Sequence, residues 1–158
     1  MQPSEIIAIL AGTYTLLNTS ATRDGVPVDD LTYGSAPVGI LTYSKTGFMS
    51  ATLTSTNPDH RPASLTFPFE ESQSDAEWAL VGKHSIGYAG PFSISGDVLA
   101  SATNGQVFHG PLTVANIPSM VAAVHRRNYT TFENGTLLRI TSQRDGSNRG
   151  ELWWKRLD

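Results

Sequence analysis

One stretch of the sequence carries three types of side chain that can act together on a carbonyl compound. In residues 123–132, His125, Arg127 and Tyr129 alternate with other residues, so they share one face if the stretch is a strand. A buried neutral imidazole can accept a proton near pH 7. A guanidinium can bind a carboxylate or a developing enolate, and a phenol can donate to a carbonyl oxygen. His109 lies on the predicted strand before them, where strand pairing could bring it close to His125. These residues predict proton transfer next to a carbonyl, or the holding of a flexible substrate in a reactive shape.

The same residues also allow a purely structural interpretation. Neither face of residues 123–132 is cleanly apolar, so the side chains could face solvent, and His109 and His125 could be hydrogen-bonded core residues. A metal site needs about three converging ligands, and the two histidines have no carboxylate beside them in sequence, so we expect no metal. The sequence also has no cysteine, no glycine-rich nucleotide motif and no Gly-x-Ser-x-Gly. We therefore expect no thiol chemistry, no serine hydrolase and no cofactor.

These residues need a framework, and the rest of the sequence predicts one made of short strands. Pairs such as Asn104-Gly105, Asn134-Gly135 and Asp145-Gly146 recur along the chain and favour tight hairpins, because Asn, Asp and Gly tolerate a positive φ. Runs rich in β-branched and aromatic residues with two-residue alternation lie between the turns, and about eight such runs indicate an antiparallel sandwich or barrel. They cover residues 13–22, 38–43, 48–54, 88–94, 106–114, 123–132, 136–141 and 151–156.

Two segments break this alternation and predict helices. Residues 1–10 place three apolar side chains at helical spacing after Pro3, which predicts a short amphipathic helix that plugs one end of the sheet structure. Residues 74–77 have the form of a capping box, which predicts a second short helix with Trp78 on its apolar face. Residues 55–73 contain three prolines and no clear period. A loop of this length is either a lid over the site or an inert surface loop.

The composition places the protein in a broad class. The 158 residues carry 11 Lys or Arg and 14 Asp or Glu, and the net charge of −3 disfavours a groove that tracks nucleic-acid phosphates. The longest apolar run near the start, residues 6–11, is far shorter than the ~20 residues that span a bilayer, and no basic segment marks it as a signal peptide. We expect a single cytoplasmic domain over residues 1–158, without a nucleic-acid or membrane partner.

Several motifs spaced along nearly the whole chain carry a family resemblance. They are Gly12-Thr13-Tyr14 near the start, YGSAPVGILTY at 33–43 followed by GFMSA at 47–51, YAGPF at 88–92, and Leu152-x-Trp154-x-Arg156 at the end. In this order they resemble the lipocalin-like domain family, which occurs in bacteria and in fungal biosynthetic clusters. The resemblance implies an all-β fold, an antiparallel up-and-down barrel around an apolar ligand cavity. The fold that the resemblance implies also brings Tyr14 and Arg156 together near one end of the barrel. There the guanidinium can stack on the ring, as a structural pair.

The resemblance also implies which side chains point into the barrel. It aligns Arg127-x-Tyr129 with an Arg-x-Tyr pattern of the family, which turns His125, Arg127 and Tyr129 inward. His109 matches a position where relatives often carry His. The resemblance therefore implies a cluster of histidine, arginine and tyrosine side chains inside an otherwise apolar cavity.

Strand alternation predicts the residues that contact a ligand. On residues 38–43 it leaves two choices, because either Val38 and Ile40 or Leu41 and Tyr43 face inward. On the other strands, apolar side chains that share a face mark the cavity wall, and the second predicted helix could add a side chain at its mouth. The predicted ligand-binding residues are Tyr43, Met49, Leu53, Tyr88, Phe92, Trp78 and Trp154.

The sequence leaves two functions open. The first is a cofactor-independent isomerase or cyclase, as some fungal relatives are, including pericyclases. It would act on a hydrophobic polyketide- or terpenoid-type intermediate of secondary metabolism. The alternative is a non-catalytic carrier of a small lipophilic ligand, which needs an apolar cavity but no proton transfer. Either could form a homodimer through an exposed strand edge or the face that carries Trp153.

Overall fold

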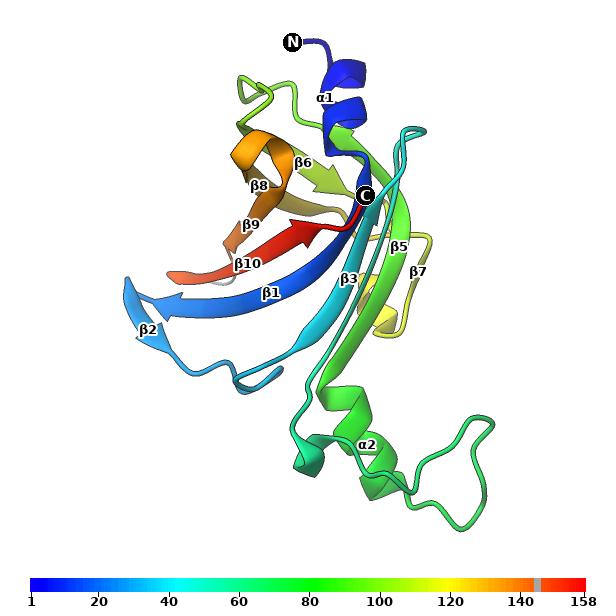
Figure 1. Ribbon diagram of the computed structural model, residues 1–158. Helices are drawn as coiled ribbons and strands as arrows, with labels where there is room; N and C mark the ends of the chain where they lie inside the picture. Colours follow the sequence, from blue (N-terminus) through cyan, green and yellow to red (C-terminus); the bar gives the residue numbers. More distant parts are fainter. Residues whose placement is uncertain (144–145) are drawn as a thin grey trace.

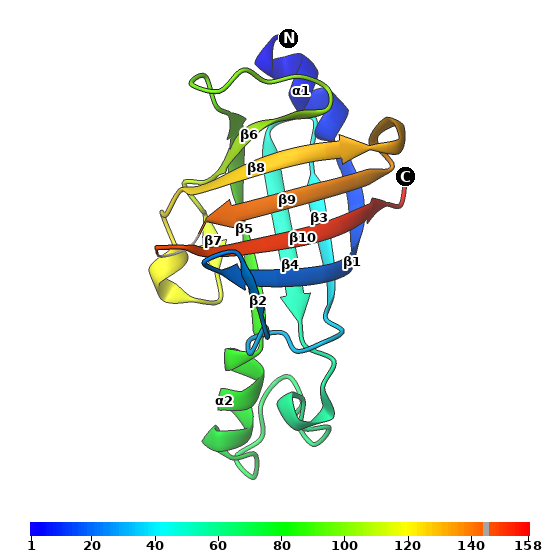
Figure 2. The same ribbon diagram turned by 90° about the vertical axis from the view of Figure 1, so that its left-hand side faces the viewer.

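The computed structural model describes residues 1–143 and 146–158, and its strands close into a barrel. Asp145, part of one predicted turn, lies outside the described residues. Eight antiparallel strands follow one another around the barrel, and the first pairs with the last (Figures 1 and 2). In barrel order they are β10 (Asn148–Arg156), β9 (Leu137–Gln143), β8 (His125–Phe132), β6 (Asn104–His109), β5 (Ser85–Ile94), β4 (Phe48–Thr54), β3 (Val38–Tyr43) and β1 (Gly12–Arg23). Two short strands, β2 (Val26–Val28) and β7 (Val114–Ala115), pair with β1 and β5.

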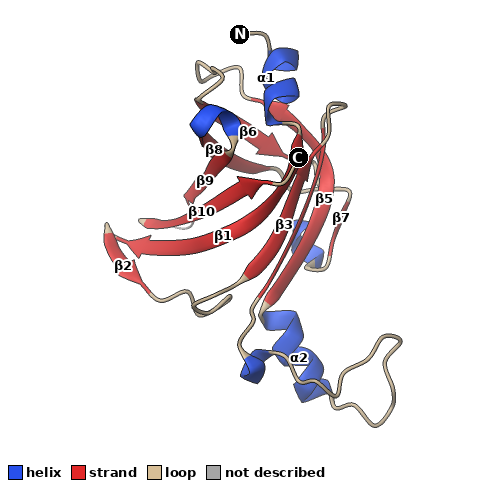
Figure 3. Ribbon diagram, viewed as in Figure 1, coloured by secondary structure: helices blue, strands red, loops and turns tan. Residues whose placement is uncertain are grey.

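Two helices lie at opposite ends of the barrel, and both were predicted (Figure 3). The first, α1 (Pro3–Leu10), buries Ile6 and Leu10 in the core and so closes one end. The second, α2 (Asp75–Lys83), begins at the predicted capping box, in which Ser74 and Glu77 bond each other's backbone N–H groups. No helix among the described residues has the length and apolar character needed to cross a membrane.

Alternation along the strands separates an apolar interior from a mixed exterior. On β4, Met49, Ala51 and Leu53 are buried while the residues between them are exposed. On β3, the sequence left open which face points inward. Leu41 and Tyr43 are buried, whereas Val38 and Ile40 are exposed, so Leu41 and Tyr43 face the interior. The barrel core therefore consists of every second residue of its strands, as the period of two requires.

Arg156 fastens the closed end of the barrel, and its predicted contact with Tyr14 is confirmed. The guanidinium lies 4.8 Å from the centre of the Tyr14 ring and also bonds the Tyr14 hydroxyl. It donates to the carbonyl oxygens of Ile9 at 2.8 Å, Ala11 at 2.6 Å and Gly135 at 3.1 Å. Two of these carbonyls lie at the C-terminal end of α1, so one side chain of the last strand holds the helix that plugs the barrel.

The predicted strand over residues 106–114 is confirmed only as far as His109, where β6 ends, and its second half is wrong because the chain leaves the barrel there. Gly110 has φ of +125° and is followed by Pro111, which has no backbone N–H to continue the ladder. The chain then runs through β7 and the 3₁₀ turn η2 (Pro118–Met120) before it returns as β8. The predicted hairpin at Asn134-Gly135 is confirmed. Both residues have positive φ in the turn η3 (Glu133–Gly135) that joins β8 to β9.

Candidate functional site

The barrel encloses a cavity of about 100 Å³ whose wall is mainly apolar. Of the described side chains that line it, Arg127 alone carries a full charge, and His109, Tyr88, Tyr33 and Ser142 add polar atoms. The remaining wall comes from strands all around the barrel and from the turn η2, through Leu41, Leu53, Ile86, Met120, Ile140 and Trp154. Such a cavity, apolar with a few convergent polar groups, is the usual form of a small-molecule site.

The pairing of β6 with β8 positions the polar groups. His109 lies opposite His125 in this ladder, and Val107 lies opposite Arg127. The burial pattern of β8 shows that His125, Arg127 and Tyr129 share the inward face, as predicted, because the first two are half-buried and Tyr129 is buried, whereas the residues between them are exposed. Since directly opposed residues point to the same side of a sheet, the two imidazoles and the guanidinium form one cluster.

His109 is the most buried member of this cluster, with 2% of its surface exposed. Its Nε2 atom lies 2.7 Å from the hydroxyl of Tyr43, whereas its Nδ1 atom has no hydrogen-bond partner among the described residues. Burial, reinforced by the positive charge of Arg127 and by His125, lowers the pKa of His109 to about 3. The imidazole of His109 is therefore neutral at physiological pH.

Two phenols stand beside the histidines and stay protonated. The ring of Tyr88 lies 6.4 Å from that of His109 and 6.3 Å from that of His125. Burial raises the pKa of Tyr88, although the charge of Arg127 and a hydrogen bond from it act in the opposite direction. Burial also raises the pKa of Tyr43 well above its usual value. Both hydroxyls therefore stay protonated at neutral pH and can donate hydrogen bonds.

His125 lies next to the cavity wall but is less buried than His109. Its Nε2 atom is enclosed and has no partner among the described residues. Burial and the nearby charge of Arg127 lower the pKa of His125, so this imidazole too is neutral at pH 7. Because it is less buried, its protonated form is penalised less, and it is the better proton acceptor of the pair.

The sequence matches the model of the lipocalin-like domain family over residues 11–157, nearly the whole length of the chain. The chain belongs to the lipocalin-like domain family. A solved structure described as a redesigned β-barrel is also similar, with a TM-score of 0.42 and 11% identity over 97% of this chain and 96% of that one. No curated protein sequence matches.

The cavity of this lipocalin-like domain gathers three of the four predicted catalytic residues. His109 and Arg127 line the cavity, and His125 adjoins them. Tyr129 is on the same face but farther along β8, where its hydroxyl donates to the carbonyl oxygen of Ser101 at 2.7 Å. Its ring packs against Gly105 rather than lining the cavity. The phenols beside the imidazoles are instead Tyr43 and Tyr88.

The predicted ligand-binding residues divide into three groups. Leu53, Tyr88 and Trp154 line the cavity of the lipocalin-like domain. The other barrel residues of the set do not line the cavity but are largely buried in the core, where the rings of Tyr43 and Phe92 lie 4.7 Å apart and Met49 is also buried. Trp78 lies outside the barrel, where it lines a separate hollow with Phe67, Phe69 and Asp75.

The sequence did not identify five of the cavity residues, which are Tyr33, Ile86, Met120, Ile140 and Ser142. The hardest of them to predict is Met120. It lies on η2, in the segment between β7 and β8 that has neither strand nor helix period. The only local signal is Pro118, which begins this turn. Its place on the cavity wall depends on the path of the chain after Gly110, which periodicity does not reveal.

The long loop, a candidate lid, is anchored beside the barrel by its first half. The ring of His60 stacks on that of His84, with centres 3.5 Å apart, and its Nδ1 atom lies 2.8 Å from the hydroxyl of Ser55. Farther along, Phe67 and Phe69 are 96% and 71% exposed. None of these loop side chains lines the barrel cavity in this structure.

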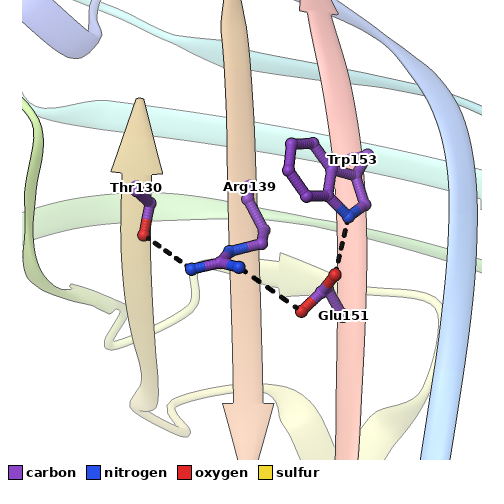
Figure 4. Close-up of polar contacts among 4 residues, drawn as sticks. All are labelled: Thr130, Arg139, Glu151 and Trp153. Carbon is purple, nitrogen blue, oxygen red and sulfur yellow. Dashed lines mark hydrogen bonds and ion pairs between the residues drawn. The ribbon is translucent and has the colours of Figure 1, made fainter. Parts of the chain in front are cut away.

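A second polar cluster lies on the outer wall of the barrel (Figure 4). Arg139 donates to the hydroxyl of Thr130 at 3.2 Å and pairs with Glu151 at 3.9 Å. Glu151 in turn accepts a bond from the indole N–H of Trp153 at 2.6 Å, and Phe132 stacks on that indole at 5.2 Å. Through these cross-strand contacts, Trp153 packs against residues of neighbouring strands in the same chain. They give a structural reason for an indole on the outer wall.

Acidification is expected to destabilise the lipocalin-like domain through His109. The unfolded chain protonates this histidine near pH 6.5, whereas the folded protein resists protonation until about pH 3. Between these values the unfolded state binds more protons, so the free energy of unfolding falls by about 1.4 kcal/mol per pH unit as the pH decreases below about 6.5. Urea unfolding at several pH values measures this slope. His109→Gln should have a shallower slope between pH 6 and 4.5, and an unchanged slope would contradict the prediction.

Proposed function

We propose that this lipocalin-like domain is a cofactor-independent isomerase or cyclase. It acts on a hydrophobic polyketide- or terpenoid-type intermediate held in the barrel cavity. The observation that carries this proposal is the pair of neutral imidazoles beside Arg127 in an otherwise apolar interior. His109 Nδ1 and His125 Nε2 both lack a protein partner among the described residues. A buried polar atom without a partner costs about 1–3 kcal/mol, so a site for apolar ligands alone would be more stable without these groups.

The cluster is suited to proton transfer next to a carbonyl. His125 accepts a proton from the carbon beside the carbonyl, and the electron pair of the broken C–H bond moves onto the carbonyl oxygen. Arg127 and the hydroxyl of Tyr88 stabilise the negative charge that develops there, and the apolar wall strengthens this interaction by excluding water. Return of the proton to a different carbon completes an isomerisation without any group from outside the chain. The wall also restricts a flexible substrate, which favours ring closure.

The size of the cavity limits what is enclosed. Sites for drug-sized ligands commonly measure about 300–1,000 Å³, and an engineered cavity of about 150 Å³ accepts benzene. The space of about 100 Å³ here is smaller than either, so it accepts at most one small ring or the end of a short chain. The reacting part of the intermediate occupies the barrel, and the rest of a longer molecule extends out of it.

The test uses a single-ring probe whose isomerisation requires the same proton transfer. Conversion of 3-cyclohexen-1-one to its conjugated isomer is followed by ultraviolet absorbance. We expect the protein to accelerate this conversion, and His125→Gln to lower the rate at least tenfold, about 1.4 kcal/mol in barrier, without weakening binding of the ketone. The matched control is His84→Gln, because His84 lies outside the cavity and bonds the carbonyl of Thr32.

The pH profile of the same reaction provides a second criterion. Only the neutral imidazole of His125 accepts a proton, and its pKa is lowered. The rate should therefore stay constant through neutral pH and decline at a lower pH than it would with an ordinary histidine, whose pKa is about 6.5. Binding of the ketone without any acceleration would contradict the proposal and favour the alternative, a carrier of a small lipophilic ligand, for which the apolar wall alone suffices.

A further inference from the structure

Arg127 is a half-buried cation without an acidic partner. It is the only charged side chain that lines the cavity among the described residues. The ion pair in the described part of the chain joins Arg139 to Glu151 on the outer wall, so no carboxylate neutralises Arg127. One Nη atom of Arg127 donates to the neighbouring carbonyl of Arg126 at 2.8 Å, and the guanidinium also donates to the hydroxyl of Tyr88. A guanidinium has five N–H donors and costs free energy when it loses water unpaired, so this arrangement leaves donors for an anion.

The contact with Tyr43 determines which nitrogen of His109 carries the proton. If the Tyr43 hydroxyl donates to Nε2, the imidazole proton lies on Nδ1, and one donor lacks a partner. If Nε2–H donates instead, the Tyr43 proton has no acceptor among the described residues and the Nδ1 lone pair is unpaired as well. The first arrangement leaves fewer buried polar groups unsatisfied and is therefore preferred. His109 thus has an N–H donor without a partner among the described residues, with Tyr43 as its positioning residue.

We propose that Arg127 and the Nδ1–H of His109 form an oxyanion subsite that binds the carboxylate or enolate oxygen of a ring-sized organic acid. This inference rests on the proposed function, because it specifies the substrate class of the same cavity. The subsite has several hydrogen-bond donors and no acidic side chain, so it disfavours binding of a cation. A neutral amide accepts hydrogen bonds from the same donors but has no negative charge to pair with Arg127. The apolar remainder of the wall, including Leu53, Ile140 and Trp154, contacts the ring.

Three probes of the same size and different charge test the inference. Benzoate, benzamide and benzylammonium each carry one phenyl ring, and their affinities at pH 7 are measured by calorimetry. We expect benzoate to bind at least tenfold more tightly than benzamide, and benzylammonium not to bind detectably. Equal affinities for benzoate and benzamide in the unmodified protein would overturn the inference without the need for any variant.

A matched pair of variants locates the subsite. Arg127→Met keeps an unbranched apolar stem but removes the charge, so the preference for benzoate over benzamide should disappear while benzamide still binds. Arg126→Met is the control, because Arg126 is the next residue on β8 and its side chain faces outward. Retention of the benzoate preference in Arg127→Met would overturn the inference. Binding of benzamide by this variant shows that its cavity is still folded.

Nitrogen chemical shifts report the proton position on His109 independently of any reaction. We expect a protonated Nδ1 in the free protein, a change of its shift when benzoate is added, and loss of the fixed tautomer in Tyr43→Phe. A proton fixed on Nε2 would contradict the assignment of His109 as donor.

The two proposals can fail independently. Isomerisation of the cyclic ketone without a preference for benzoate would refute only this inference. A preference for benzoate without isomerisation would refute only the proposed catalysis.

Discussion

Arg156→Ala is expected to lower the free energy of unfolding by about 3–5 kcal/mol, because one side chain satisfies three carbonyl groups and a phenol at the closed end of the barrel. Hydrogen bonds from a charged donor each contribute more than neutral ones, and here they are shielded on one side by Tyr14. Without the guanidinium, the carbonyls of Ile9 and Ala11 lose their donor, and α1 loses its attachment to β10.

Two further variants define this effect in urea unfolding followed by tryptophan fluorescence. Arg156→Lys keeps the charge but not the planar fork, so its loss of stability should be intermediate. Arg149→Ala removes an exposed arginine from the same strand and should change the free energy of unfolding by less than about 0.5 kcal/mol. A loss below about 1 kcal/mol in Arg156→Ala would mean that packing of Ile6 and Leu10 alone holds the helix.

Gly110→Ala is expected to be at least as damaging, with a loss of about 3–5 kcal/mol, and to separate the two histidines of the site. Gly110 has φ of +125°, which side-chain-bearing residues rarely adopt. A Cβ atom there would lie 2.2 Å from the carbonyl oxygen of Ala123, and a backbone atom cannot move aside as a flexible side chain can. The clash would push the end of β6 away from the start of β8, where His109 and His125 face each other.

Gly82→Ala is the matched control for this substitution. Gly82 lies inside α2, and an added Cβ would meet no heavy atom within 4 Å. Alanine is the better helix former, so this variant should gain up to about 1 kcal/mol in the free energy of unfolding. Near-native stability of Gly110→Ala in the same assay would contradict the prediction, because it would show that the segment after β6 can change conformation without lowering the free energy of unfolding.

The fold followed from the sequence wherever local signals and periodicity agreed. The bounds predicted for β3 and β4 match the structure, because clear alternation ends at turns on both sides. The inward face of β3 could not be chosen locally, since both faces of residues 38–43 carry apolar side chains and only packing across the barrel distinguishes them. The Gly110-Pro111 signal was overlooked, and this alone extended the predicted strand past His109.

The candidate site was predictable in part. Alternation along residues 123–132, with the family resemblance, placed His125 and Arg127 correctly on the inward face. The contact between Tyr43 and His109 joins residues 66 positions apart. It depends on how the sheet closes, which no local pattern encodes. The hydroxyl of Tyr129 is bonded to Ser101 for a similar reason, because the course of the loop between β5 and β6 places that carbonyl above it.

The pairing of every barrel strand with two neighbours affects how molecules of the protein associate at high concentration. Unpaired strand edges are the usual templates for intermolecular sheets and for fibrils. Each of the eight barrel strands has a neighbour on both sides, and the two remaining strands in the described chain are only three and two residues long. A homodimer would therefore join through side chains on the outer wall, and we expect crowded solutions of the folded protein to form no cross-β fibrils.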